Sequence, residues 1–308
     1  MNALNKYKRD LINLGQTNQQ KRFIESSFAR WYFNVPKTDI LPLQNMVERH
    51  DLEFANQSTF LGFDIPRFLK TSEELFRGLR PDSAAQYPNL DSMITTAQLA
   101  RLKKIYKGRD FEGDKNKLLG IYNFVGINSI HLSIPPIFKG TELFGSPLNT
   151  HNQKYCSPFA VDKLFRSSGS FFNFTPKDDG VYLCNPPFDE EIIRNMAVRL
   201  LSWMAGKPQI VVICTVPVWD SASQRKLGMK DYGMQFEGFD SLIASKFCYE
   251  RDILMKNEYP YWDYYSKKSI PASHTHLIFL SNCSRAFFED LGIVQKFKEN
   301  WKKWALEN

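Results

Sequence analysis

Residues 180–216 read GVYLCNPPFDEEIIRNMAVRLLSWMAGKPQIVVICTV, and this stretch decides the fold. The run Gly180–Cys184 predicts a strand. Asp189 predicts the N-cap of a helix whose apolar residues recur at steps of three and four, and a Gly-Lys-Pro segment ends that helix. Gln209–Val216 is continuously apolar, as strands buried on both faces of a parallel sheet are. The stretch therefore predicts a strand–helix–strand unit of an α/β protein.

The rest of the chain predicts two domains. We also expect strands at Thr141–Phe144, Ser170–Phe174, Ser241–Tyr249 and His276–Leu280, and a C-terminal helix over 284–306. Before residue 126 the apolar spacing is helical, with a capping box at Thr71–Glu74 and N-caps at Thr96 and Asp114 for helices over 97–107 and 115–124. The sequence thus predicts a helical domain over 1–125 and a Rossmann-like α/β domain over 126–308.

Composition narrows the class of protein. The chain has 308 residues, of which 43% are hydrophobic and 24% charged, as is ordinary for a globular protein. No apolar run reaches membrane-spanning length, and the N-terminus lacks the apolar core of a signal peptide. The five scattered cysteines form no CxxC pair or Cys/His cluster. We therefore expect reduced thiols, no metal site, and an intracellular location, nuclear or cytoplasmic.

The segment Asn185-Pro186-Pro187-Phe188 follows directly on a predicted strand and suits the methylation of a base amine. Such an amine is a poor nucleophile, because its lone pair is delocalised into the ring. The Asn185 side-chain oxygen and the Pro186 carbonyl can each accept one amine hydrogen, while the Phe188 ring stacks on the base. Both prolines have a fixed φ, which makes the loop stiff. Alone, these four residues are equally typical of a strand-ending turn.

A second loop lies about 40 residues upstream, in Glu142–Asn149. Gly145 at a strand end lets the backbone approach a ligand closely, and Glu142 is placed to hold an amino group or ribose hydroxyls. A lone glycine is more often simply a turn. A donor-type loop one strand–helix unit before an amine-gripping loop, however, favours an amino-methyltransferase more than either segment does alone.

Two further segments suggest contacts with RNA. The stretch Arg101–Arg109 holds five cations and no acid, and the chain carries a net charge of +7. Such a cluster suits phosphate, although the last turn of a helix also favours cations. Glu258–Lys268 is rich in aromatic residues, which either stack on a methylated guanine or pack onto another domain. Trp219 is expected beside the Asn-Pro-Pro-Phe loop, whereas His274 and His276 are expected in a hairpin rather than in catalysis.

Several of these segments resemble one known family. Phe138–His151, Lys154–Phe159 and Cys184–Glu191 are similar to the cap-specific mRNA adenosine-N6 methyltransferases, the phosphorylated-CTD-interacting-factor family. The order and spacing also agree through Ile213–Trp219 and Thr275–Asn282, so the resemblance covers about residues 128–282. It implies a class I methyltransferase domain, S-adenosylmethionine as donor, and as acceptor the adenosine next to the m7G cap, often already 2′-O-methylated.

The resemblance also implies site residues, and the sequence departs from it in two places. Animal members carry a WW module, yet no segment here has paired tryptophans at that spacing. Asn173 stands where an acidic residue is expected for the donor ribose. The residues predicted to grip the base are Asn185, Pro186, Pro187 and Phe188; those facing the donor are Glu142, Phe144, Gly145, Ser146, Pro147, Asn149 and Asn173; those contacting RNA are Arg101, Lys103, Lys104, Lys107, Trp219 and Trp262.

The two loops favour methylation of a base amine, and the resemblance implies that this amine is N6 of the cap-adjacent adenosine of mRNA. One alternative is a DNA adenine-N6 methyltransferase, which has to flip its base from a duplex; no large target-recognition domain is evident for it. Another is an inactive cap- or RNA-binding protein of the same fold, which Asn173 keeps open and the intact Asn-Pro-Pro-Phe segment disfavours.

Overall fold

The computed structural model describes residues 9–18, 21, 92, 94–125, 132–188, 190–206, 208–231, 233, 236–264 and 266–307. The chain divides into two compact units, Met1–Ser129 with Pro158–Val161, and Ile130–Ser157 with Asp162–Asn308. The helix expected after Thr71–Glu74 lies outside the described residues, as does Asp189, the predicted N-cap.

Among its described residues, the first unit holds a helical stretch over 9–13 and two longer helices. Helix α6 spans Thr96–Ile105 and is capped by Thr95, not by Thr96 as predicted, because the Thr95 hydroxyl and the Gln98 side chain form a capping box. Helix α7 spans Phe111–Val125 and begins four residues before the predicted start. The earlier start follows from Asp110, whose carboxylate accepts a hydrogen bond from the Gly113 amide at 2.9 Å.

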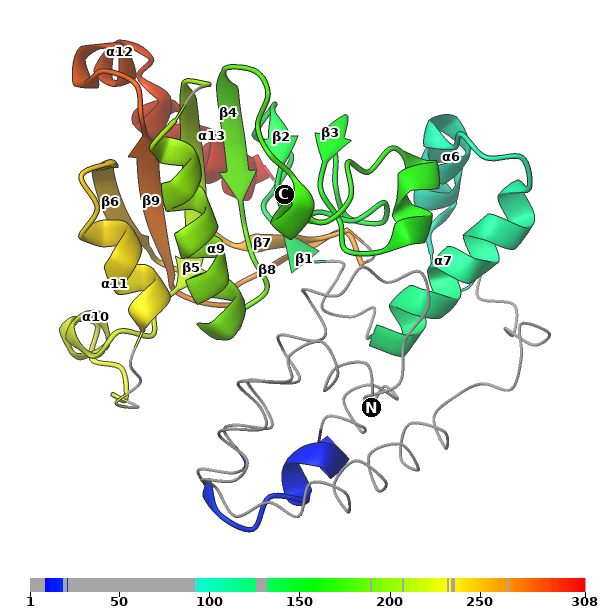
Figure 1. Ribbon diagram of the computed structural model, residues 1–308, viewed down its shortest axis with the longest axis horizontal. Coiled ribbons are helices and arrows are strands. Elements are labelled where there is room, and N and C mark those ends of the chain that lie inside the picture. The colour runs from blue at the N-terminus through cyan, green and yellow to red at the C-terminus, as the bar shows by residue number, and fades with distance from the viewer. Residues whose placement is uncertain are drawn as a thin grey trace. The chain divides into compact units, whose positions relative to one another are not determined.

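The second unit is built on a mixed six-stranded sheet (Figure 1). In spatial order its strands are β3 (Lys154–Tyr155), β2 (Thr141–Glu142), β4 (Gly180–Cys184), β5 (Ile210–Pro217), β9 (Thr275–Ser281) and β6 (Cys248–Leu254). The first four are parallel, and β9 is antiparallel to both of its neighbours. A smaller antiparallel sheet consists of β1 (Leu132–Ser133), β7 (Tyr261–Asp263) and β8 (Lys268–Ile270). The unit is an α/β fold compatible with a Rossmann-like methyltransferase.

Helices cover both faces of the main sheet. Helices α9 (Glu190–Met204) and α11 (Glu237–Ile243) lie on one face, and α12 (Arg285–Asp290) and α13 (Ile293–Glu307) lie on the other, with α13 behind the sheet in Figure 1. Further helical segments are η2 (Ala160–Phe165), η3 (Phe171–Asn173) and α10 (Ser221–Lys226).

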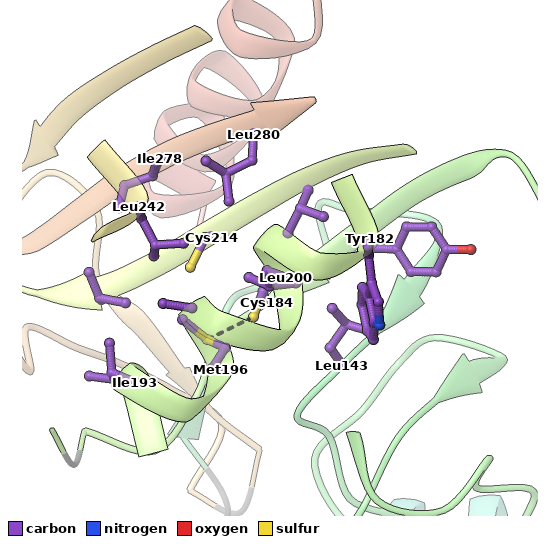
Figure 2. Close-up of a cluster of buried hydrophobic side chains, with 14 of the residues drawn as sticks. Leu143, Tyr182, Cys184, Ile193, Met196, Leu200, Cys214, Leu242, Ile278 and Leu280 are labelled. Carbon is purple, nitrogen blue, oxygen red and sulfur yellow. Dashed lines mark hydrogen bonds between the residues drawn. The ribbon is translucent and has the colours of Figure 1, made fainter. Parts of the chain in front are cut away.

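The core explains why the opening stretch folds as predicted. All eight residues of β5 are buried, as its unbroken apolar run predicts. On the α9 side, Met196 and Leu200 pack with Cys184 and Cys214, which lie opposite each other on β4 and β5 (Figure 2). The Cys184 thiol donates to the Met196 sulfur at 3.1 Å. All five cysteines are free, as expected for reduced thiols.

Two expected strands differ from the structure. Ser170–Phe174 is not a strand: the Ser170 hydroxyl caps the 3-10 helix η3 instead. The segment expected as a strand over Ser241–Tyr249 ends helix α11, and β6 begins only at Cys248. Gly238 explains the helix, because a Cβ there would lie 2.7 Å from the Arg194 amide nitrogen of α9, so only glycine allows this close helix contact.

The predicted C-terminal helix is divided in two. Gly292 has a φ of 55°, a left-handed conformation that ends α12 before α13 begins. The strand predicted over Thr141–Phe144 is also shorter than expected, since β2 ends at Glu142. Residues 143–149 are therefore free to form a loop at the carboxyl edge of the sheet.

Candidate active site

The loops that follow β2 and β4 begin side by side at the carboxyl edge of the main sheet. Glu142 lies opposite Leu183 in the parallel register, and the Leu143 amide donates to the Leu183 carbonyl at 2.8 Å. The chain runs from β2 to β3 on one side, whereas β4 pairs on the other side, so the strand order reverses here. Open α/β sheets bind their ligands at such a switch point.

Glu142 is the centre of the first loop. Its side chain is 1% exposed and accepts hydrogen bonds from Ser133 Oγ at 3.2 Å, from Thr150 Oγ1, and from Asn152 Nδ2 at 3.5 Å. Gly145 passes close over this carboxylate: a Cβ there would lie 3.2 Å from both Glu142 Cδ and Thr150 Cβ. The structure therefore places Glu142 beneath the loop, where it holds the loop in shape.

The other polar residues of this loop bond to one another. Asn149 Oδ1 accepts from the Ser146 amide at 2.9 Å and from the Ser146 hydroxyl at 3.0 Å, and Ser146 Oγ in turn accepts from the Asn149 amide at 3.1 Å. Pro147 is buried, while Phe144 is half-buried. Of the residues predicted to face the donor, Phe144 is thus the most accessible in this loop, and Ser146 and Asn149 stabilise its turn.

Asn173 reaches the same region from another element. It ends η3, and its side chain is exposed. The neighbouring rings hold η3 against the first loop, because Phe171 and Phe172 lie 4.7 and 6.1 Å from Phe144, measured between ring centroids. Asn173 is therefore free to offer its amide to a ligand of that loop.

The Asn-Pro-Pro-Phe loop is built differently. Asn185 is half-buried, and its Oδ1 accepts a hydrogen bond from Thr215 Oγ1 of β5 at 2.8 Å. Pro186 is buried, Pro187 is exposed, and Phe188 is one of the few large apolar side chains exposed in the described chain, at 38%. The loop thus has one end fixed to the sheet and the other end open to a ligand.

Two aromatic residues contact the Phe188 ring in an edge-to-face geometry. Trp219, just beyond β5, lies 6.2 Å from Phe188 with an interplanar angle of 77°, and Tyr261 of β7 lies 6.3 Å away at 84°. Trp219 therefore lies beside the loop, as the sequence predicts. Contacts of this geometry fix the Phe188 ring without stacking on it.

Sequence reasoning missed Thr215 and Tyr261. Thr215 stands out as the polar residue within the apolar run of β5, and Tyr261 lies in the aromatic-rich segment next to the predicted Trp262. Trp262 itself is half-buried and lies 4.9 Å from Trp304 of α13, edge to face. Tyr259 and Tyr261 are buried against Trp301, so this segment packs largely inward.

A hydrogen bond between Asp220 and His276 supports the same edge of the sheet. Asp220 caps α10 by accepting from the Ser223 amide at 2.8 Å, and its Oδ2 lies 2.6 Å from Nε2 of His276. Burial lowers the pKa of His276, and the bond to Asp220 only partly offsets this. Burial would raise the pKa of Asp220, but hydrogen bonds from Ser223 and His276 outweigh it and the pKa is lowered. His276 is thus a buried strand residue stacked on Phe239.

The predicted basic cluster lies in the first unit, on α6 and the loop after it. Lys103, Lys104 and Lys107 are exposed, and Arg101 is half-buried. Lys103 and Arg109 help to line an open hollow of about 460 Å³. Tyr106 and Phe111 line it too, so cations and rings share the surface that we expect to meet RNA.

Two absences hold for the described residues. No described helix is long and apolar enough to cross a membrane. Likewise, within the part of the chain that the structure describes, no group of three or more His, Cys, Asp or Glu side chains is arranged to hold a metal ion.

Comparison with known proteins points to the same region. Residues 137–262 match the family model described as the phosphorylated CTD interacting factor 1 WW domain, and these residues include β2 to β5 of the main sheet and both loops. Two relatives, from Homo sapiens and Mus musculus, are named mRNA (2'-O-methyladenosine-N(6)-)-methyltransferase; each is 35% identical to this chain over 80 residues. These matches cover 25% of this chain and 11% of each relative, so only a small part of the relatives' length is matched.

Proposed function

We propose that the protein methylates N6 of the adenosine next to the m7G cap of mRNA, as a relative of the phosphorylated CTD interacting factor 1 family whose model residues 137–262 match. One observation carries the proposal: a glycine-containing loop and the Asn-Pro-Pro-Phe loop begin on adjacent parallel strands, at the switch point of the sheet. The names of the two relatives support an RNA methyltransferase.

The residues of the first loop fit S-adenosylmethionine as the donor. Gly145 brings the backbone to the sheet edge without a side chain, the half-buried ring of Phe144 offers an apolar face, and the exposed amide of Asn173 suits a ribose hydroxyl. Glu142, Ser146, Pro147 and Asn149 act by shaping the loop. When bound, the donor supplies an electrophilic sulfonium methyl group.

The acceptor loop makes the amine reactive. The second lone pair of Asn185 Oδ1 and the Pro186 carbonyl accept the two N6 hydrogens, which draws the nitrogen lone pair out of the ring and toward the methyl group. Bound S-adenosylmethionine would supply the methyl group, Asn185 and Pro186 would orient the amine to receive it, and the proton that N6 loses would pass to water. The partly exposed ring of Phe188 stacks on the adenine and keeps it in plane. This chemistry needs orientation rather than a strong base.

Each unit by itself carries residues that we assign to RNA contacts. Trp219 borders the target nucleotide beside Phe188. The exposed cations of the basic cluster, including Lys103, Lys104 and Lys107, contact phosphates, so RNA affinity falls steeply with salt. Arg101 and Trp262 are assigned to the same role from the sequence, although Trp262 is half-buried against Trp304.

A methylation assay with three acceptors tests the function. The protein is incubated with labelled S-adenosylmethionine and m7G-capped RNA that begins with adenosine, the same RNA uncapped, or duplex DNA. Label on capped RNA alone is the expected result. Label on uncapped RNA as well removes the cap from the specificity, label on duplex DNA favours the DNA methyltransferase, and RNA binding without label indicates an inactive RNA-binding protein.

Substitution of Asn185 tests the amine-gripping role. We expect Asn185→Ala to lower kcat at least about 100-fold, the scale seen when one preorganised transition-state hydrogen bond is removed. Affinity for S-adenosylmethionine, measured by calorimetry, should stay within about twofold, because the donor loop stands on its own hydrogen bonds. Asn185→Asp keeps acceptor oxygens and serves as the matched variant, with more activity than Asn185→Ala. Full activity of Asn185→Ala refutes the role.

A further inference from the structure

Thr215 connects the interior of the sheet to the acceptor loop. It lies on β5 opposite Leu277 of β9, in a strand whose residues are all buried, and its side chain is 0% exposed. Its hydroxyl donates to Asn185 Oδ1 at 2.8 Å. A polar group at this depth needs a partner, and the partner here is the side chain that is to grip the amine.

This bond decides which way the Asn185 amide faces. The oxygen and the NH₂ group of an amide have nearly the same shape, so packing alone distinguishes them poorly. A donated O–H selects the oxygen on the side facing β5 and leaves its second lone pair for another hydrogen. With the amide turned over, Asn185 presents donors, which repel the N6 hydrogens instead of accepting them.

The surroundings of Thr215 keep its hydroxyl in place. The Thr275 hydroxyl donates to the Ser273 carbonyl at 3.2 Å, and its oxygen lies 3.3 Å from the hydroxyl oxygen of Tyr261. Burial raises the pKa of Tyr261 to about 12, although hydrogen bonds with Thr275 and Thr215 act to lower it. The phenol therefore stays protonated in the working pH range. These buried hydroxyls form a fixed polar layer behind the acceptor loop.

We propose that Thr215 is a positioning residue for methyl transfer, which sets the orientation of the Asn185 amide through its hydroxyl. The inference rests on the proposed function and deepens it, because it names what prepares the amine-gripping group before the substrate arrives. Thr215 does not touch the substrate. Its effect therefore falls on the chemical step rather than on binding.

Two substitutions at this position separate orientation from packing. Thr215→Val keeps the shape and removes the hydroxyl, and we expect kcat on capped RNA to fall roughly 10- to 100-fold, the range for groups that orient a functional side chain. KM for RNA and the Kd for S-adenosylmethionine should change less than about twofold. Thr215→Ser restores the hydroxyl and should recover kcat to within about threefold of the parent value.

Ser281→Ala is the matched control for the loss of a buried hydroxyl. Ser281 is 0% exposed on β9 and donates to the Ile210 carbonyl at 3.1 Å, at the opposite end of the β5–β9 pair. It should lose thermal stability much as Thr215→Val does but keep its kcat. The inference is overturned if Thr215→Val retains kcat, if KM rises instead, if serine fails to rescue, or if Ser281→Ala loses kcat equally. An unmodified protein that labels no acceptor overturns the proposed function instead, so the two failures are distinguishable.

Discussion

The two loops at the carboxyl edge of the sheet are stabilised in opposite ways. The loop after β2 is held from within, by the buried carboxylate of Glu142 and by the mutual hydrogen bonds of Ser146 and Asn149. The loop after β4 is stabilised by residues of other segments. Thr215 of β5 donates a hydrogen bond to Asn185, and Trp219 and Tyr261 contact the Phe188 ring edge to face.

This difference indicates a division of labour. A loop that uses its polar side chains on itself keeps a fixed backbone shape, which suits a ligand recognised by shape and backbone contacts. The loop after β4 is stabilised by residues of other segments, so the Phe188 ring and part of Asn185 remain available for a substrate. Substitutions in the first loop should therefore affect stability and donor binding together, whereas those in the second should affect turnover or RNA binding and leave stability alone.

Glu142→Ala should have the largest effect on stability. The hydroxyls of Ser133 and Thr150 and the amide of Asn152 would lose their shared acceptor within a buried site. We expect the free energy of unfolding, measured by urea titration, to fall by about 3 kcal/mol or more, and donor affinity to fall with it.

Glu142→Gln is the control for this prediction. It keeps one carbonyl oxygen in nearly the same volume, so it should lose clearly less stability than Glu142→Ala. A Glu142→Ala protein as stable as the parent would contradict the internal support of the first loop.

Phe188→Ala should have an intermediate effect, and it should change RNA affinity rather than stability. The loss of one base–aromatic stack should weaken RNA affinity by about 1–3 kcal/mol, or roughly 5- to 150-fold. Because the ring is 38% exposed, stability should change by no more than about 0.5 kcal/mol. Fluorescence anisotropy with capped RNA measures the affinity, and Phe188→Tyr, which keeps the ring, is the matched variant. A large loss of stability with unchanged RNA affinity would make Phe188 a packing residue.

Those parts of the sheet that depend on neighbouring residues in the sequence could be predicted. Strands β4 and β5 and helix α9 follow from apolar runs and periodicity, and Trp219 follows from its place at the end of β5. Such features depend on neighbours in the sequence. Helix α11 was missed because its stability depends on the close approach of Gly238 to α9, which no local pattern reveals.

The outer support of the acceptor loop could not be predicted for the same reason. Thr215 reaches Asn185 across 30 residues of sequence, and Tyr261 reaches Phe188 across 73. Both contacts exist only once the strands are ordered. The burial of Glu142 was also missed, because a carboxylate at a strand end is equally suited to face a ligand, and only the donors of Ser133, Thr150 and Asn152 turn it inward.

The smallest expected effect concerns pH and the hydrogen bond between Asp220 and His276. Because the pKa of His276 is below its usual value of 6.5 in the folded protein, the unfolded chain binds a proton first as pH falls. Stability is therefore present above pH 6.5 and is lost as pH falls toward the folded pKa of His276. The lowered pKa of Asp220 acts in the same direction, but only near and below its unfolded value of 3.8.

Urea titrations at pH 7.5, 6.5 and 5.5 test this support. His276→Gln keeps a donor for Asp220 without a titrating ring, so its stability should fall less between pH 7.5 and 5.5 than that of the parent, by on the order of 1 kcal/mol. Part of the fall should remain, because burial also lowers the pKa of His274. An identical pH profile in parent and variant would mean that His276 does not couple stability to pH.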